Sequence, residues 1–484
     1  MLNTDEINQL REAWRLSGYD RYGQISAYGG RALTAASRRD YRELLDLVEN
    51  DALGVWTTLF TMGLQVPRHE AQAALHPLPL AVALRSGLLV EGSEDVVRAG
   101  WGLQFDPANR AVFSDQLPQM SGVRRTDHVL GLGGATKLLG DITLRREVPT
   151  ALEIGTGCGV HALSLPSHVG RVTATDLNPR ALDFARINAG VNEIELELLQ
   201  GDMFEPVSER QFDLITANPP FVIATPGQGW TYRDAGREGD SLGAELAAAA
   251  RSKLRPGGVM QFLANWLEIK GERSEDRVAA WFPSEGVRVW AVEREQLDPL
   301  DYVRNWQRDS GDQADPHETA QWLNWFSERK VEGIGFGFVT VEAIEGPSDI
   351  VCDGVSHTVA YPWSDRIEER LVQRRVLSTM DPETFLEAKL SLADSVSLNQ
   401  EADQGPDGWE VKRQWLKSLQ GLRYADEIDQ LMVTLLASCN GQVPLRLQIE
   451  LLAQTFDGEP GVVYAGLYPE IRRLIDRGYV LVDS

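Results

Sequence analysis

Cysteine is scarce in this sequence, and histidine is nearly as rare. The 484 residues include three cysteines, Cys158, Cys352 and Cys439, and seven scattered histidines. An odd number of widely separated cysteines does not fit a disulfide framework and is typical of a protein kept in a reducing compartment. No pair of cysteines has the spacing of a zinc site. We therefore expect no metal site.

Long hydrophobic runs are also missing. The longest ones, such as LPLAVAL and LGAELAAAA, are much shorter than a bilayer requires, although 43% of the residues are apolar. The first stretch, MLNTDEINQLREAW, carries acids and has no apolar core of the kind found in secretory signals. These features predict a protein without a membrane span and with a cytoplasmic location.

Positive charge is in short supply. The chain has 47 lysines and arginines against 71 acidic residues, a formal charge of −24, which argues against an extended basic surface for nucleic acid. The charge is uneven, about −2 over residues 1–150 and about −22 over residues 151–484. Either a local basic patch or an ordinary solvated face is compatible with the basic residues before the acidic part: Arg31, Arg38, Arg39, Arg42, Arg124, Arg125, Lys137, Arg145 and Arg146.

The pattern along the chain divides it into three parts, as its length suggests. Residues 1–125 read as short helices followed by the strand pair GWGLQFD and AVFSDQL, which is typical of a helical, winged-helix-like accessory domain. Residues 346–484 begin at a break in EGPSDIVCDG and read as a mainly helical accessory domain. Its predicted helices include EVKRQWLKSL, and LNQEADQGPDG is predicted as a polar loop.

Residues 126–345 alternate between strands and helices. Seven strands are expected, at TALEI, RVTATD, IELELL, FDLITAN, GGVMQFLAN, VRVWAVE and FGFVTVEAI, with a helical insert containing ETAQWLNWFSERK before the last. Such alternation predicts an α/β domain whose mostly parallel seven-stranded sheet is covered by helices on both faces. Its ligand site should lie at the carboxyl ends of the strands.

The first of these strands runs into the glycine-rich stretch GTGCG. Gly155, Gly157 and Gly159 would let the backbone approach a ligand closely and turn tightly into a helix. A dinucleotide-binding loop is similar, which leaves an NAD-dependent oxidoreductase as an alternative, but that fingerprint requires glycine where this chain has Val160. Glu153, just before the loop, is an acid that either binds the ligand or orders the loop.

Acidic residues follow at the ends of the next two strands. Asp176, in ATDLNP, can accept two hydroxyl hydrogen bonds from a ribose, whereas Asn178 is better placed to cap the helix that begins at Pro179. In GDMF, Asp202 is placed to accept from an exocyclic amine and Met203 to lie against a purine face. We therefore expect a nucleoside at this edge of the sheet.

The stretch ANPPF follows the fourth strand. Two consecutive prolines remove two backbone donors and fix two φ angles, so the chain after Asn218 is stiff and extended. A rigid segment at a strand end is an ordinary way to present side chains to a ligand. A simple turn after the strand is the structural alternative.

Together, these motifs resemble the class I S-adenosylmethionine-dependent methyltransferases over residues 126–265, and more loosely up to residue 345. ANPPF is similar to the Asn-Pro-Pro-aromatic signature of the branch that methylates nitrogen, which includes ribosomal RNA guanine-N2 methyltransferases and release-factor glutamine methyltransferases. The resemblance implies a Rossmann-like methyltransferase domain with S-adenosylmethionine as cofactor. It implies these cofactor-binding residues: Glu153, Gly155, Thr156, Gly157, Gly159, Asp176, Leu177, Asp202, Met203 and Asn218.

The resemblance also gives ANPPF a chemical role. A conjugated amine or amide nitrogen is a poor nucleophile because its lone pair is delocalised. The Asn218 side-chain oxygen and the Pro219 carbonyl can hold its two hydrogens and favour a pyramidal nitrogen. Pro220 adds rigidity, and Phe221 can stack on the planar acceptor, which positions it for transfer. The expected catalytic residues are therefore Asn218, Pro219, Pro220 and Phe221.

Two neighbouring segments are further candidates. DHVLGLGGATKLL, ahead of the first strand, is predicted to fold over the cofactor entrance. After ANPPF, the residues Trp230, Tyr232 and Arg233 either line an acceptor pocket or pack against the domain. The branch often has a double glycine where this chain has Ala235 and Gly236, so the role of that loop stays open.

The methyl acceptor is open at this stage. About 125 residues precede the catalytic part and about 140 follow it, more than a small acceptor needs, so we expect a macromolecule. An RNA or DNA base is favoured by the arginines of the first third and would make the protein nucleic-acid binding, whereas a protein glutamine is favoured by the overall acidity. The alternatives are a small-molecule N-methyltransferase and a non-catalytic module that binds S-adenosylmethionine.

Overall fold

The computed structural model describes residues 1–93, 95–116, 125–220, 222–223, 238–309, 315–355, 359, 362–406 and 408–483. These residues form two compact units. Unit 1 contains residues 1–140 and 146–354, and unit 2 contains residues 141–145 and 355–484. The three domains expected from the sequence, 1–125, 126–345 and 346–484, stay a prediction.

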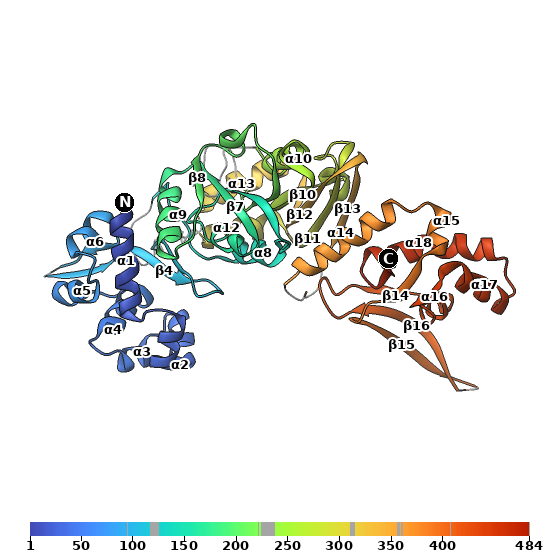
Figure 1. The fold of residues 1–484 in the computed structure, drawn as a ribbon, viewed down its shortest axis with the longest axis horizontal. Helices are drawn as coiled ribbons and strands as arrows, with labels where there is room; N and C mark the ends of the chain where they lie inside the picture. The colour runs from blue at the N-terminus through green and yellow to red at the C-terminus, as the bar shows by residue number, and fades with distance from the viewer. Residues whose placement is uncertain are drawn as a thin grey trace. The chain divides into compact units, whose positions relative to one another are not determined.

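Short helices make up most of the amino-terminal part of unit 1 (Figure 1). Helix α2 was not expected, because three glycines interrupt its apolar pattern, and Gly29 has a non-helical φ of 74° inside it. Its start is stabilised by Asp20, whose side chain accepts a hydrogen bond from the backbone of Gly23 at 2.7 Å. The helices are α1 (Thr4–Ser17), α2 (Arg21–Ser37), α3 (Arg42–Leu47), α4 (Ala52–Trp56) with a π-helical turn (Thr57–Thr61), α5 (Arg68–Ala74) and α6 (Leu80–Ser86).

Two small antiparallel sheets accompany these helices. One has the strand order β1-β3-β2 and the other is the hairpin β4-β5, which is the strand pair predicted from the sequence. Helices followed by short antiparallel strands are the arrangement expected for a winged-helix-like segment. The strands are β1 (Val66–Pro67), β2 (Leu89–Glu91), β3 (Val96–Ala99), β4 (Trp101–Phe105) and β5 (Ala111–Asp115).

A large, mostly parallel sheet forms the centre of the rest of unit 1 (Figure 1). Its strand order is β13-β11-β12-β10-β9-β6-β7-β8, and β12 runs antiparallel to both of its neighbours. The seven predicted strands are present, which confirms the Rossmann-like α/β fold. They are β6 (Val148–Ile154), β7 (Val169–Asp176), β8 (Glu197–Gln200), β9 (Phe212–Ala217), β10 (Leu254–Ile269), β11 (Glu285–Leu297) and β12 (Val331–Pro347).

An eighth strand lies at the edge of this sheet. β13 (Asp349–Gly354) pairs in parallel with β11, although EGPSDIVCDG was read as the break that ends the domain. Gly346 and Pro347 are residues typical of a break in regular structure. Directly after them, however, Ile350 and Cys352 pack against the sheet core, and this burial keeps the segment extended.

The helices that follow the strands pack against the sheet. α10 and α11 bury residues such as Leu246 and Val278 in a core shared with β6, β9, β10, β11 and β12. Between β11 and β12, the insert of α12 and α13 buries Tyr302, Trp322 and Phe326 against Leu267. The helices of this part of the chain are α8 (Gly134–Ile142), which precedes β6, and α9 (Pro179–Val191), α10 (Ser241–Lys253), α11 (Ser274–Ala279), α12 (Pro299–Asp309) and α13 (Pro316–Glu328), with 3₁₀ turns at Ala162–Ser167 and Glu205–Val207.

Helix α9 joins the amino-terminal part of unit 1 to the sheet. α1 packs beside it (Figure 1), and one core contains Phe184 of α9 together with Trp101 and Phe113 of the β4-β5 hairpin. Asn188, fully buried on α9, exchanges two hydrogen bonds with the backbone of Phe113, at 2.7 and 2.8 Å. The same side chain donates to the carbonyl of Cys158 at 2.8 Å, so it also holds the glycine-rich loop.

Unit 2 combines helices with two antiparallel sheets, of orders β18-β14-β19 and β15-β16-β17. Its helices are more extensive than its strands, as expected. The elements are α14 (Ser364–Ser378), α15 (Pro382–Glu387), β14 (Lys389–Leu392), β15 (Val396–Gly405), β16 (Gly408–Ser418), β17 (Ala425–Glu427), α16 (Gln430–Leu436), β18 (Asn440–Pro444), α17 (Leu445–Thr455), α18 (Pro460–Asp476) and β19 (Val480–Asp483).

Two predictions within unit 2 were wrong. The segment EVKRQWLKSL is not a helix but most of strand β16, and LNQEADQGPDG is not a loop but most of β15 and the start of β16. The two strands pair over their whole length as a long hairpin (Figure 1). Glu, Lys, Arg and Gln are good helix formers, but intrinsic propensity is a weak determinant of conformation, and the cross-strand pairing outweighs it here.

Candidate active site

The register of the sheet brings the predicted site residues to one edge. Ile154 of β6 lies opposite Thr175 of β7 on one side and Ala217 of β9 on the other, and Asp176 lies opposite Gln200 of β8. The residues that follow these strands therefore leave the sheet side by side. They are the glycine-rich loop at 155–159, the segment 201–203 and the ANPPF stretch.

The glycine-rich loop depends on backbone angles that favour glycine. Gly155, Gly157 and Gly159 have φ of 67°, 57° and 82°. At Gly159 a Cβ would also lie 3.1 Å from the Cβ of Ala185, so this glycine lets the loop pack against α9. At Gly157 a Cβ would meet nothing within 4 Å, which leaves the backbone open to a ligand.

Asp176 ties this loop to the end of β7. Its carboxylate accepts hydrogen bonds from the backbone N–H groups of Gly157 and Asn178, both at 2.8 Å. Burial raises the pKa of Asp176 above its usual value, which the two N–H donors partly oppose. Asn178 caps α9 by accepting from Arg180 N–H at 3.0 Å, so Asp176 is left to serve the loop and a ligand.

Glu153 lies beneath the loop and is 2% exposed. It accepts a hydrogen bond from the Thr156 hydroxyl at 2.6 Å. Burial raises the pKa of Glu153 to about 8, so the carboxyl group is largely protonated at neutral pH. This environment suits the loop-ordering role left open by the sequence, although Glu153 also borders the cavity described below.

The segment after β8 continues the same edge. The N–H of Gly201 donates to the carbonyl of Asp176 at 3.1 Å, which brings Asp202 and Met203 beside the end of β7. Met203 adopts the left-handed conformation, with φ of 48°, and Leu177 is 56% exposed. Leu177, Asp202 and Met203 border the cavity.

Asn218, Pro219 and Pro220 leave β9 next to the glycine-rich loop. The backbone oxygen of Asn218 lies 3.7 Å from where a Cβ on Gly155 would stand. Pro219 is buried, and Asn218 and Pro220 are half-buried. Phe221, the fourth predicted catalytic residue, lies outside the described residues, as do Trp230, Tyr232, Arg233, Ala235 and Gly236.

One cavity of about 1360 Å³ collects these residues. Its lining includes every described residue predicted for the cofactor or the acceptor except Gly159, which packs inward. Single small-molecule sites usually occupy roughly 300–1,000 Å³, so this cavity has room for a cofactor and for a second planar group. The predicted residues that line it are Glu153, Gly155, Thr156, Gly157, Asp176, Leu177, Asp202, Met203, Asn218, Pro219 and Pro220.

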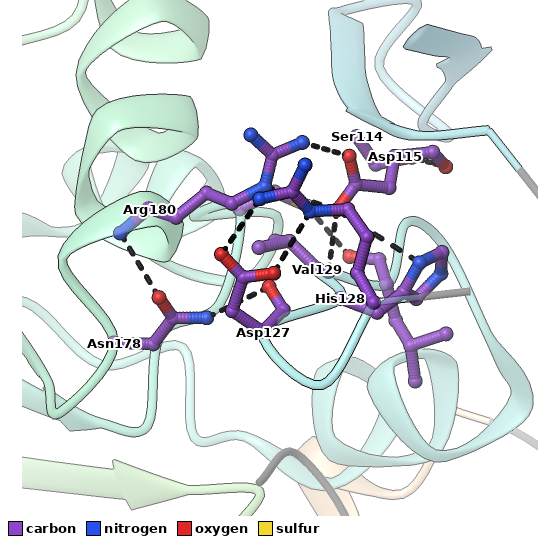
Figure 2. A network of polar contacts seen from close by, with 10 residues as sticks. Ser114, Asp115, Asp127, His128, Val129, Asn178 and Arg180 are labelled. Carbon is purple, nitrogen blue, oxygen red and sulfur yellow. Dashed lines mark hydrogen bonds and ion pairs between the residues drawn. The ribbon is translucent and has the colours of Figure 1, made fainter. Parts of the chain in front are cut away.

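A polar network that the sequence did not reveal forms another wall of the cavity (Figure 2). Asp115, at the end of β5, accepts from the backbone of Val129 at 2.9 Å and pairs with Arg180 at the start of α9. Asn178 donates to the carbonyl of Asp127 at 3.1 Å. The network holds residues 127–129 against the start of α9, and most of DHVLGLGGATKLL lines the cavity. That this segment folds over the cofactor entrance stays a prediction.

The insert between β11 and β12 supplies residues that the sequence analysis also missed. Tyr302 and Trp306 of α12 border the cavity together with Asn265 of β10. Tyr302 and Trp306 lie 37 and 41 positions after Asn265, and no local motif in the sequence predicts that they meet it. Only the burial of α12 against the sheet edge brings them together.

The cavity residues fit S-adenosylmethionine. A backbone cradle that is open at Gly157, an acid at the end of β7 and a second acid after β8 are the donor and acceptor set that a nucleoside with a methionine tail requires. Among the described residues, no group of three or more histidines, cysteines or acids could hold a metal ion. The described helices include none that is long and apolar enough to cross a membrane.

Comparisons with known proteins agree with the function that the residues of this site suggest. Residues 131–269 match the family described as "Methyltransferase small domain". Flanking residues 21–100 and 371–482 match families described as "Domain of unknown function", DUF7059 and DUF7782 respectively.

Full-length relatives extend the match. The release factor glutamine methyltransferase of Deinococcus radiodurans is 29% identical over 45% of this chain and 86% of that protein. The one from Moorella thermoacetica is 31% identical over 41% of this chain and 78% of that protein. A solved structure of the T. Thermophilus 16S rRNA N2 G1207 methyltransferase with AdoMet and guanosine aligns at 16% identity over 46% of this chain and 60% of that chain. The TM-score of this alignment is 0.27.

The chain belongs to the class I S-adenosylmethionine-dependent methyltransferases, in the Asn-Pro-Pro-aromatic branch that includes these release factor glutamine methyltransferases. It is an S-adenosylmethionine-dependent methyltransferase, and S-adenosylmethionine is its cofactor. The family, the enzyme class and the cofactor predicted from the sequence are thereby confirmed. The roles of the individual residues stay predictions.

Proposed function

We propose that this protein transfers a methyl group to a planar amino or amide nitrogen of a macromolecule. The position of Asn218 carries the proposal. Asn218 directly follows β9, borders the same cavity as Asp176, and has its carbonyl beside Gly155. The group that would hold the acceptor therefore adjoins the loop that would hold the cofactor.

Asn218 and Pro219 would hold the acceptor nitrogen. The Asn218 Oδ1 and the Pro219 carbonyl can accept its two N–H hydrogens, which weakens conjugation and frees the lone pair. Bound S-adenosylmethionine would supply the methyl group to this nitrogen, its sulfonium leaving with the carbon–sulfur electron pair as a thioether, and one N–H proton would be lost to solvent. Pro219 is buried and its ring fixes φ, which would hold the Pro219 carbonyl in place for transfer.

Other residues of the cavity would hold the cofactor. The Asp176 carboxylate keeps lone pairs beyond the two N–H groups it already accepts, enough for ribose hydroxyls. Asp202 would accept from the adenine amine, and the open backbone at Gly157 would lie along the methionine part.

Two observations favour a macromolecular acceptor. The relatives of this branch are named for methylating the glutamine of a release factor, which is itself a protein. The amino-terminal part of unit 1 also contributes to the cavity, through residues such as Arg39, Tyr41 and Thr61. A base of RNA or DNA and a glutamine of a protein are both macromolecular acceptors of this kind. The cytoplasmic location stays a prediction.

The test uses Asn218→Ala and Asn218→Asp beside the parent protein. If Asn218 orients the acceptor, Asn218→Ala should keep its affinity for S-adenosylmethionine and its melting temperature, while single-turnover methyl transfer falls by roughly 100-fold or more. Asn218→Asp keeps an acceptor oxygen and should retain partial activity. A folded, cofactor-binding Asn218→Ala protein that transfers methyl at the parent rate would remove Asn218 from the mechanism.

A further inference from the structure

Residues 128–136 form a continuous wall of the cavity, and every residue of this run borders it. Most of the glycine-rich loop and Asp176, which are predicted to hold S-adenosylmethionine, border the same cavity. Bound cofactor would therefore meet this wall. The contacts that fix the wall thus bear on cofactor binding.

Hydrogen bonds attach the start of this wall to the β4-β5 hairpin. Asp115, at the end of β5, exchanges two of them with Val129. The N–H of Val129 donates to Asp115 Oδ2 at 2.9 Å, and the N–H of Asp115 donates to the carbonyl of Val129 at 3.0 Å. Asp115 also pairs with Arg180, at the start of α9 (Figure 2). Because Val129 and Asp115 are 3% and 8% exposed, this attachment is shielded from water.

A second attachment lies three residues further along the wall. Gln104 of β4 accepts the backbone N–H of Leu132 through its Oε1, at 2.8 Å. A backbone N–H can only donate, so the amide oxygen of Gln104, and not its nitrogen, must face Leu132. The partner therefore fixes the orientation of this amide.

Between the two attachments, Gly131 lets the wall approach the hairpin closely. A Cβ on Gly131 would lie 2.8 Å from Ser114 Oγ and closer still to the Gln104 side chain, so no side chain fits while the hairpin keeps its position. On the other side, the carbonyl of Leu130 accepts the Cys158 thiol at 3.1 Å. Residues 129–132, which we call the strap, thus lie between the hairpin and the glycine-rich loop.

The residues that follow the strap constrain it little. Gly133 and Gly134 are exposed, and a Cβ on either would meet no described atom within 4 Å. Glycine also restricts the backbone less than any other residue. The position of the strap therefore depends mainly on its contacts with the hairpin and with the glycine-rich loop.

We propose that Gln104 and Asp115 are positioning residues for S-adenosylmethionine, and that they act by holding the strap in place at the cofactor cavity. The β4-β5 hairpin, in the amino-terminal part of unit 1, thereby takes part in cofactor binding. This role concerns the cofactor alone, so it is the same for a nucleic-acid acceptor and for a protein acceptor.

The physical reason is preorganisation. A segment that becomes ordered only when a ligand binds adds its lost conformational freedom to the cost of binding. A strap that the hairpin already holds avoids that cost and keeps the cavity wall closed around the ligand. Loosening the strap should therefore weaken cofactor affinity, mainly by making dissociation faster.

Variants at Gln104 give the main test, because this side chain is exposed and its loss opens no void in the core. Gln104→Leu should raise the Kd for S-adenosylmethionine by about 2- to 10-fold, the scale of one hydrogen bond. Gln104→Glu keeps an acceptor oxygen for Leu132 and should stay within about twofold of the parent. Calorimetry and stopped-flow dissociation measure these effects. Equal loss in both variants, or no loss in Gln104→Leu, would overturn the proposal.

A second readout needs no cofactor. In the cofactor-free protein, amide hydrogen exchange over residues 129–132 should be faster in Gln104→Leu than in the parent, and unchanged in Gln104→Glu. This comparison separates a loosened strap from the loss of a direct contact between Gln104 and the cofactor. Exchange at the parent rate in Gln104→Leu would overturn the role of the strap even if the affinity fell.

Gln211→Leu is the matched control. Gln211 is also exposed, and its side chain also makes one hydrogen bond to the backbone, donating to the carbonyl of Ser252 at 3.1 Å. It directly precedes β9, whereas Asn218 follows the other end of that strand. Gln211→Leu should leave the affinity for S-adenosylmethionine and the exchange of the strap unchanged. A loss as large as that of Gln104→Leu would show a general effect and overturn the proposal.

Asp115→Asn tests the first attachment. The amide has one acceptor oxygen where the carboxylate has two, and it lacks the charge that pairs with Arg180. We expect a loss of cofactor affinity at least as large as in Gln104→Leu, with faster exchange at Val129. The melting temperature shows whether the variant is folded. A folded Asp115→Asn protein with the parent affinity and the parent dissociation rate would remove Asp115 from this role.

Discussion

At the scale of single residues, the site separates into side chains that serve the loop and side chains that face the cavity. Thr156 and Glu153 satisfy each other beneath the glycine-rich loop, and Asn188 holds the loop from the side of α9. Asp176 does both, because its carboxylate accepts two backbone N–H groups and still borders the cavity. We therefore expect substitution of Asp176 to weaken the binding of the cofactor.

Asp176→Ala should weaken the binding of S-adenosylmethionine by about 1–3 kcal/mol, the range for polar groups left without a partner. Titration calorimetry measures this change. Asp183→Ala is the control, because Asp183 lies seven residues further on, is partly exposed, and pairs with Arg186. Equal cofactor affinity in Asp176→Ala, Asp183→Ala and the parent would remove Asp176 from the cofactor site.

The sequence revealed residues whose neighbours are local and missed those whose neighbours are distant. The glycine-rich loop, Asp176 and Asn218 each follow a strand, so the pattern alone placed them on one edge. Asp115 and Arg180 meet across 65 positions, and Asn265 and Tyr302 across 37. Such pairs exist only once helices and strands have packed, and no spacing rule predicts them from one sequence.

At the scale of elements, the glycine-rich loop packs closely against α9. Gly159 combines a left-handed φ with a close approach to Ala185, and two separate constraints thus exclude a side chain there. The same scale explains the wrong predictions. β13 and β16 have sequences with turn or helix preferences, and in both the pairing with a neighbouring strand decides the conformation.

Gly159→Ala should lower the free energy of unfolding by about 1–3 kcal/mol, the cost of a left-handed non-glycine residue. Chemical denaturation measures this change. Gly30→Ala is a matched control, because Gly30 lies in α2, has no left-handed φ, and a Cβ there meets nothing within 4 Å. That variant should be neutral or stabilised by up to about 1 kcal/mol. If Gly159→Ala unfolds like Gly30→Ala, the close packing of loop and helix is wrong.

At the scale of the whole molecule, two carboxyl groups with raised pKa values, the buried Glu153 and the half-buried Glu293, make stability depend on pH. Burial raises the pKa of Glu153 to about 8, and burial, with the nearby charge of Glu268, raises the pKa of Glu293 to about 7. The folded state therefore holds protons that the unfolded state has released. The stability that these two groups contribute is full below the ordinary carboxyl pKa near 4.5 and is lost as the pH rises through the raised values.

Glu293→Gln should remove the part of this pH-dependent loss of stability that comes from Glu293. The amide can still accept the hydrogen bond from the Trp266 ring, 3.0 Å away in the parent, and it does not ionise. The melting temperature of Glu293→Gln relative to the parent should rise between pH 5 and pH 8. Glu332→Gln, at an exposed carboxylate that pairs with Lys270, should show a constant offset. Parallel curves for Glu293→Gln and the parent would contradict the raised pKa.

The hydrogen bonds of Asn188 limit how the amino-terminal segment can be removed, by truncation or during evolution. The side chain joins β5, the glycine-rich loop and α9, so a fragment that begins at residue 126 would leave a buried amide facing the place that Phe113 has vacated. Any lineage or engineer that discards the first segment must at the same time replace this asparagine. The amino-terminal segment is thus a structural part of the catalytic fold, independently of any role in binding a substrate.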